Sequence, residues 1–196
     1  MNPETRPFRV ALDFGTGSLT PFGESLVRRL SDMAGSYADQ AAVDSLLACG
    51  ADPVIYRAYD AGVPHQPGHL IFRTTIIDAG TVGSEFFMTK GHHHDRDSAE
   101  LYLGMSGQGL MLMESRKGGF SSEELAPHAA VYVPPGWAHR TVNTGTEPLI
   151  FLAAYFADAG HDYAAIERSG FSRRVHRGET GPELRPAAAR LGEVTG

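Results

Sequence analysis

Residues 85–105 read EFFMTKGHHHDRDSAELYLGM. This stretch decides the fold because three consecutive histidines join two segments whose residue pattern is typical of β-strands. On an extended strand, side chains two residues apart project from the same face. His92 and His94 therefore share one face, and His93 points to the opposite one. If Glu100 lies on the next strand, its carboxylate can join the two imidazoles on that shared face.

A second patch lies further along the chain, where residues 131–139 read VYVPPGWAH. This pattern predicts a strand that ends in a turn stiffened by two prolines. Such a turn can place His139 opposite the histidine pair. In a small antiparallel barrel, alternate residues of every strand meet in the interior. Glu100 and Tyr102 would then share the inner face.

Three imidazoles and one carboxylate form a donor set for a divalent transition metal, which needs several nitrogen and oxygen donors converging on one point. We therefore expect His92, His94, Glu100 and His139 to ligate one metal ion. Four protein ligands leave two positions of an octahedral ion open to water or substrate oxygens, as is typical of catalytic or ligand-binding sites. The ligand types suit iron, manganese, nickel, cobalt or zinc and do not select among them.

Short β-branched or aromatic runs separated by turn signals dominate the chain from residue 53 onward. This spacing is typical of an all-β sandwich or barrel. The expected strands cover residues 54–59, 70–77, 85–90, 99–105, 109–114, 129–133 and 149–156. Before them, residues 23–34 and 37–49 space their apolar side chains as helices do, and Gly50 is expected to end the second helix.

We find no repeat and no interdomain linker, so we expect a single domain over residues 1–196. In this interpretation, residues 1–50 hold an N-terminal strand and helices, and residues 53–160 form the barrel. Residues 178–196 are rich in proline, alanine and glutamate with few large apolar side chains. We expect this tail to lie on the surface or to be poorly ordered.

The composition excludes several classes of function. The 196-residue chain has a formal net charge of -6 and no block of lysine or arginine, which argues against nucleic-acid or anionic-membrane partners. No apolar run approaches the roughly 18 residues of a transmembrane helix. The first residues also lack the apolar stretch of a signal peptide. The lone cysteine, Cys49, permits no internal disulfide and is expected to be buried. The unpaired cysteine, with no signal peptide or transmembrane segment found, predicts a cytoplasmic location.

The two histidine patches match the two cupin motifs, which are His-x-His with a nearby glutamate, and a distal proline-glycine turn before a histidine. Within the cupins, the chain resembles the archaeal-type glucose-6-phosphate isomerases over about residues 8–175. The matching stretches are residues 27–33, 52–56, 74–75, 83–92, 99–102, 131–143, 151–155 and 157–163. The chain departs from that pattern in a shorter loop at residues 95–98, in residues 61–68 and in the tail.

The resemblance implies an all-β fold, the cupin double-stranded β-helix (a jelly-roll-like barrel), with short N-terminal helices, a peripheral C-terminal tail and one metal ion held by the four ligands above. It also implies a pocket for a phosphosugar substrate. The implied substrate-binding residues are Thr75, Thr89, Gly91, Tyr102, Tyr155, His161 and Tyr163. Threonine hydroxyls and the Gly91 amide are neutral donors suited to a phosphate. Lys90 is an alternative phosphate ligand if its side chain does not point out of the barrel.

The implied activity is a metal-dependent aldose–ketose isomerisation of glucose 6-phosphate and fructose 6-phosphate in a homodimer. Such a reaction passes through an enediol and needs a base near both carbons, for which Glu100 is the candidate. Tyr155 and His161 would position substrate or aid ring opening. A hydride shift remains an alternative mechanism. Alternative functions are isomerisation of another phosphosugar such as mannose 6-phosphate, a cupin dioxygenase or decarboxylase, and a non-catalytic sugar-binding cupin.

Overall fold

A computed structural model describes residues 6–187 of the chain. Its largest sheet is six-stranded and antiparallel, in the order β11-β8-β13-β5-β4-β3. The strands are β3 (Ser25–Arg29), β4 (Val54–Asp60), β5 (Leu70–Ile77), β8 (Glu100–Ser106), β11 (Ala130–Val133) and β13 (Leu149–Phe156). Consecutive β5 and β4 pair directly, whereas β13 lies between β5 and β8, so distant segments meet in the middle of this sheet.

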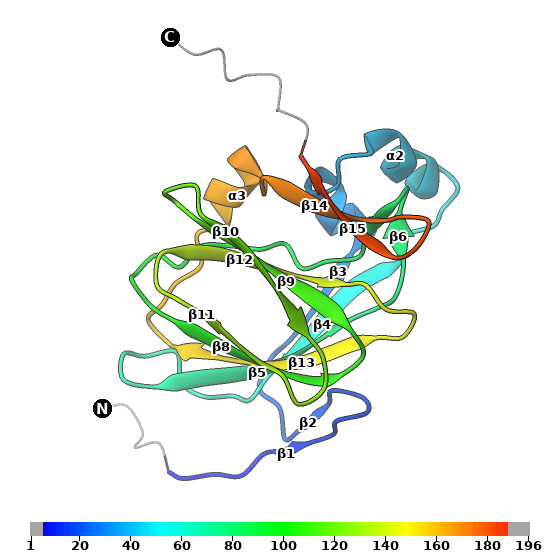
Figure 1. The fold of residues 1–196 in the computed structure, drawn as a ribbon. Coiled ribbons are helices and arrows are strands. Elements are labelled where there is room, and N and C mark those ends of the chain that lie inside the picture. The colour runs from blue at the N-terminus through cyan, green and yellow to red at the C-terminus, as the bar shows by residue number, and fades with distance from the viewer. Residues whose placement is uncertain (1–5, 188–196) are drawn as a thin grey trace.

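A three-stranded sheet in the order β10-β9-β12 lies opposite the large sheet, and the two layers enclose the barrel interior (Figure 1). Its strands are β9 (Gly109–Ser115), β10 (Phe120–Leu125) and β12 (Trp137–Asn143). Side chains from both layers fill the space between them, including the fully buried Met111, Leu149 and Phe151. Burial of such residues is the main force that holds the two sheets together.

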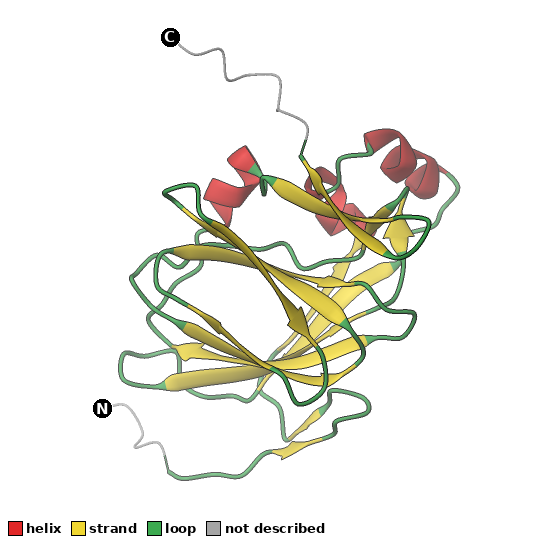
Figure 2. Cartoon of the chain, in the orientation of Figure 1, coloured by secondary structure: helices red, strands yellow, loops and turns green. Residues whose placement is uncertain are grey.

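Shorter elements cover the ends of the barrel. A four-stranded sheet contains β6 (Thr81–Val82), β7 (Glu85–Phe86), β14 (Arg173–Arg177) and β15 (Pro182–Pro186), and a two-stranded one contains β1 (Ala11–Leu12) and β2 (Leu19–Thr20). The helices are α1 (Leu30–Met33), the 3-10 helix η1 (Ala34–Ser36), α2 (Gln40–Ala48) and α3 (Tyr163–Ser169). Figure 2 shows the helices gathered at one end of the strands, away from β1 and β2.

The all-β barrel predicted from the sequence is confirmed, and several strands have the expected bounds. On β8 the side chains alternate as expected, since Glu100 and Tyr102 are buried while Leu101 and Leu103 are exposed. Within the described residues, none of the helices is long and apolar enough to cross a membrane.

The helix expected over residues 23–34 is wrong in its first half, where residues 25–29 form β3. The spacing of Leu26 and Leu30 fits a helix, but hydrogen bonding of this segment to β4 outweighs the local preference. The strand expected at residues 85–90 is regular only over β7. Cys49 is exposed rather than buried, because it follows the last turn of α2.

Several regular elements were not expected, and the longer ones among them are β10, β12, α3 and β14. The tail predicted from residue 178 onward includes β15, an exposed strand that pairs with β14. The remainder of that tail, residues 188–196, lies outside the described residues.

Candidate active site

His92 and His139 face each other because the backbone of residues 88–92 runs antiparallel to β12. His92 N donates to His139 O at 3.2 Å and His139 N donates to His92 O at 3.0 Å. Gly91 makes this approach possible, since its φ is +75° and a Cβ there would lie 2.7 Å from the Phe171 ring and 3.0 Å from His139 O. A residue with a side chain would therefore be both strained and crowded at this position.

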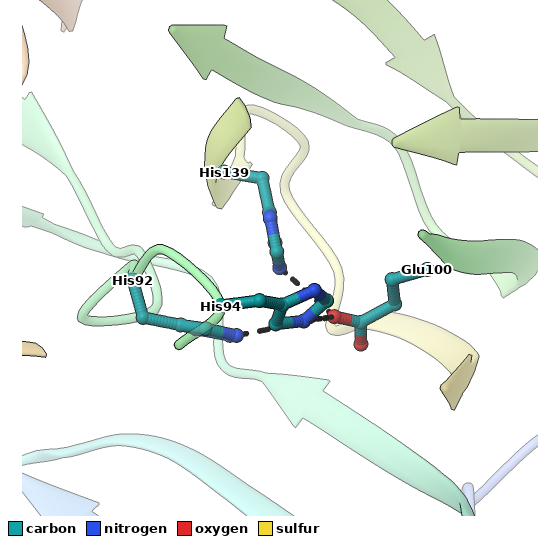
Figure 3. A group of neighbouring side chains, drawn as sticks. All are labelled: His92, His94, Glu100 and His139. Atoms are coloured by element: carbon teal, nitrogen blue, oxygen red, sulfur yellow. Dashed lines mark hydrogen bonds and ion pairs between the residues drawn. The ribbon is translucent and has the colours of Figure 1, made fainter. Parts of the chain in front are cut away.

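Glu100 opens β8 on the inner face of the large sheet, directly opposite Tyr155 on β13. Its Oε2 atom lies 3.0 Å from His94 Nε2, 3.0 Å from His139 Nε2 and 3.9 Å from His92 Nε2. Figure 3 shows the three rings and the carboxylate converging on one point. The four ligand atoms lie within 4.8 Å of one another. Bonds of about 2.0–2.2 Å to a common ion would set ligand atoms about 3–4.4 Å apart, so the cluster is close to the size of a metal shell.

The hydrogen bonds around the cluster fit a bound cation. His94 Nδ1 lies 2.8 Å from Ser98 O, and His139 Nδ1 lies 3.4 Å from Trp137 O. A carbonyl oxygen only accepts, so these Nδ1 atoms carry a proton, and Nε2 is the atom of each ring that can bind a cation. His94 Nε2 and His139 Nε2 each lie 3.0 Å from Glu100 Oε2, so either a proton on the ring or a cation shared by all three atoms can lie between them. The residues present therefore fit a divalent metal ion.

The surroundings hold His92 and Glu100 in the deprotonated forms that a metal requires, whereas hydrogen bonds with Glu100 and Ser98 outweigh burial and raise the pKa of His94. Burial lowers the pKa of His92 well below the usual value, and the neighbouring His139 adds to this effect. Burial raises the pKa of Glu100, but its contacts with His139 and His94 outweigh it and hold that carboxyl well below its ordinary range. Burial also lowers the pKa of His161 to about 4. The buried Nε2 atoms of His92 and His139 have no hydrogen-bond partner among the described residues.

A pocket opens beside the cluster, between the large sheet on one side and residues 89–92 and β12 on the other. Ten of the eleven residues singled out from the sequence line it, and the eleventh, His94, closes the cluster behind them. The ten are Thr75, Thr89, Gly91, His92, Glu100, Tyr102, His139, Tyr155, His161 and Tyr163. The structure thus brings together every predicted site residue, although they come from six separate segments of the chain.

Aromatic rings form one wall of this pocket. The His161 ring lies 4.4 Å from that of His92 and 5.2 Å from that of Tyr155, and it stacks on Tyr163 at 5.8 Å with an angle of 10° between the planes. Asp162 holds these residues in place, because its carboxylate caps α3 by accepting from Ala165 N. His93 is not a member of the cluster, and its backbone pairs with that of Asp162.

Part of the pocket lining was not predicted from the sequence. Arg73, Tyr56 and Thr141 reach the same pocket from β5, β4 and β12. Arg73 precedes Thr75 by two residues on an expected strand, so the period of two could have indicated a shared face. Lys90 lines the pocket too, and its Nζ pairs with Glu167 Oε1 at 2.6 Å.

The fold and the cluster together define a cupin-type barrel with a buried site that could hold a metal ion. The model of the glucose-6-phosphate isomerase family matches residues 27–184. The chain belongs to this family, and the resemblance stated from its motifs is confirmed.

Curated relatives agree with this assignment. The chain is 48% identical over 171 residues to the glucose-6-phosphate isomerase of Thermococcus gammatolerans, covering 87% of this chain and 89% of the relative. It is 49% identical over 170 residues to that of Thermococcus litoralis, covering 86% and 88%. A putative glucose-6-phosphate isomerase 2 of Rhizobium meliloti is 39% identical over 165 residues, covering 84% and 82%.

Proposed function

We propose that this chain interconverts glucose 6-phosphate and fructose 6-phosphate with a divalent metal ion held by His92, His94, Glu100 and His139. The observation that carries the proposal is the convergence of four buried ligand atoms within 4.8 Å at the base of a pocket lined with hydroxyl groups. Membership of the glucose-6-phosphate isomerase family, and the names of relatives 48% identical to the chain, support the choice of substrate.

The phosphate end of the substrate is assigned to Thr75, Thr89 and the Gly91 amide. Thr89 and Thr141 are held side by side by backbone pairing, since Thr89 N donates to Thr141 O at 2.9 Å. Thr89 Oγ1 also accepts from Thr141 N at 3.0 Å, which fixes the rotamer of Thr89. A fixed hydroxyl loses little entropy when it donates to a phosphate oxygen. The sugar carbons would then extend toward Glu100 and the aromatic wall.

Isomerisation needs a group that removes a proton from one carbon and returns it to the next. We assign this role to Glu100, which would act through its free carboxylate oxygen or after loosening from the metal, because Oε2 faces the imidazoles. When bound, a divalent ion supplies a Lewis acid for the oxygen that becomes negative in the enediol. Tyr155 and His161 would hold the sugar oxygens and pass protons during ring opening. Burial raises the pKa of Tyr155, so its hydroxyl stays protonated and donates.

We also propose that the chain forms a homodimer through its large sheet. A homodimer is supported by exposed apolar side chains on strands of the large sheet, among them Leu70, Leu101, Tyr132 and Phe156. Single exposed apolar side chains are common on monomers, but several on one sheet suit a contact with a second copy of the chain. The cytoplasmic location and the single domain over residues 1–196 stay predictions.

A coupled assay on chelated protein, with one metal added back at a time, tests the function. We expect fructose 6-phosphate to form from glucose 6-phosphate only after a metal is restored, and mannose 6-phosphate to react less efficiently. Reaction in D2O should place deuterium in the product if Glu100 transfers a proton that exchanges with solvent. Metal-loaded protein that forms no fructose 6-phosphate would refute the proposed activity.

A further inference from the structure

Two cationic side chains line the pocket among the described residues, Arg73 and Lys90, and they differ in how firmly they are paired. Lys90 Nζ lies 2.6 Å from Glu167 Oε1 and 5.7 Å from the centre of the Tyr163 ring, so a neighbouring carboxylate already neutralises it. Arg73 Nη2 lies 3.5 Å from Asp60 Oδ2, at the limit of a hydrogen bond. Its buried Nε has no hydrogen-bond partner in the described part of the chain.

Arg73 projects from the same face of β5 as Thr75, two residues away. It is paired across the sheet with Asp60 on β4 and with Ala153 on β13. Two residues along a strand span about 7 Å, which the flexible guanidinium stem can cover. The guanidinium also lies 5.4 Å from the centre of the Tyr155 ring, beside the metal-ligand cluster. Arg73 is therefore located between the threonine end of the pocket and its aromatic wall.

The charge of Arg73 already acts on the interior of the pocket. Burial raises the pKa values of both Tyr155 and Tyr163, and the Arg73 charge opposes that rise in each. Asp60 does not depend on Arg73, because it also accepts from Gly62 N at 2.8 Å and has His65 Nε2 at 3.7 Å. Arg73 can therefore exchange its weak contact with Asp60 for a stronger one with a dianion.

We propose that Arg73 is the side chain that neutralises the substrate phosphate, and so selects phosphorylated over neutral sugars. The inference rests on the proposed function, since Thr75, Thr89 and the Gly91 amide supply only neutral donors. A guanidinium adds charge-assisted hydrogen bonds in the planar geometry that suits phosphate oxygens. Lys90 remains with Glu167.

The test uses the metal-loaded 196-residue chain and its variants Arg73→Met and Arg73→Lys. Kinetics with glucose 6-phosphate give KM and kcat, and inhibition constants are measured for inorganic phosphate and for the neutral polyol D-glucitol. We expect Arg73→Met to raise KM and the phosphate inhibition constant by about 10- to 100-fold, with kcat and D-glucitol inhibition little changed. Arg73→Lys should recover part of the loss. Arg57→Met is the matched control, because Arg57 pairs with Asp78 at 2.9 Å and does not line the pocket.

An unchanged phosphate inhibition constant in Arg73→Met would overturn the inference. Equal weakening of phosphate and D-glucitol would also overturn it, since a purely structural role would affect both. A larger loss in Lys90→Met than in Arg73→Met would assign the phosphate charge to Lys90 instead. If the wild-type protein lacked isomerase activity, the proposed function would fail on its own. Calorimetric binding of inorganic phosphate to wild type and Arg73→Met would still decide the role of Arg73.

Discussion

Replacing Gly91 by alanine should destabilise the protein and weaken metal binding together. Gly91 has a φ of +75°, and an added Cβ would lie 2.7 Å from Phe171 Cε2, 3.0 Å from His139 O and 3.1 Å from Arg140 Cβ. The left-handed conformation costs a residue with a side chain about 1–2 kcal/mol. Forcing a methyl group against the Phe171 ring and a backbone carbonyl adds about 1–3 kcal/mol. We therefore expect Gly91→Ala to lower the free energy of unfolding by about 2–5 kcal/mol.

Gly118→Ala is the matched control for this prediction. Gly118 has a φ of +83°, but a Cβ there would meet nothing within 4 Å. It should lose only the conformational part, about 1–2 kcal/mol. Urea unfolding of chelated protein gives both losses, and metal titration gives the affinities. Gly91→Ala should also bind metal at least about tenfold more weakly, because it moves the backbone of His92 against that of His139. Equal losses of stability in the two variants, with unchanged metal affinity, would refute the reasoning.

Three further predictions address the interior. Glu100→Gln should weaken metal binding by about tenfold or more and lower kcat by about a hundredfold or more. Both effects are expected because the substitution removes a metal ligand and the assigned base. Near-normal turnover would contradict the role of Glu100 as the base. Arg174→Met should lower the free energy of unfolding in urea by about 3–5 kcal/mol. The reason is that Glu85 Oε1, 2.6 Å from Arg174 Nη1, would stay buried without its cation. A loss below about 1 kcal/mol would show that Glu85 finds another partner. His161 has a pKa of about 4 in the folded protein, below its unfolded value near 6.5. Between these two pH values the unfolded chain binds a proton that the folded chain does not. In chelated protein, the contribution of His161 to the free energy of unfolding is therefore complete above pH 6.5 and is lost as the pH falls toward 4. His161→Gln should flatten this part of the pH dependence by less than about 3 kcal/mol, and an unchanged slope would contradict the assignment.

The members of the cluster could be predicted because their geometry is mostly local. His92 and His94 are two residues apart in extended backbone, and Glu100 and Tyr102 are two apart on β8, so the period of a strand assigns their faces. The placement of His139 was less direct. A turn stiffened by proline was expected to set it opposite the pair, whereas its position is fixed by backbone hydrogen bonds with His92 in a strand that was not expected.

Non-local pairing explains what the sequence did not predict. The spacing of Leu26 and Leu30 is compatible with a helix, and only hydrogen bonding to β4 makes residues 25–29 a strand. The period of two on β5 could have placed Arg73 on the same face as Thr75, but it does not show that the pocket extends as far as residue 73. The location of Arg73 follows from the register of β5 with β4 and β13, which single-sequence spacing does not contain.

The central claim is that one metal ion, bound by the four ligands, enables isomerisation. The most direct test is a titration of chelated wild-type protein with a divalent metal, following bound metal and fructose 6-phosphate formation in the same samples. We expect both to rise together and to saturate at about one ion per chain, and we expect His139→Ala to lose both. Full activity in chelated protein, or normal metal binding and turnover in His139→Ala, would contradict the account.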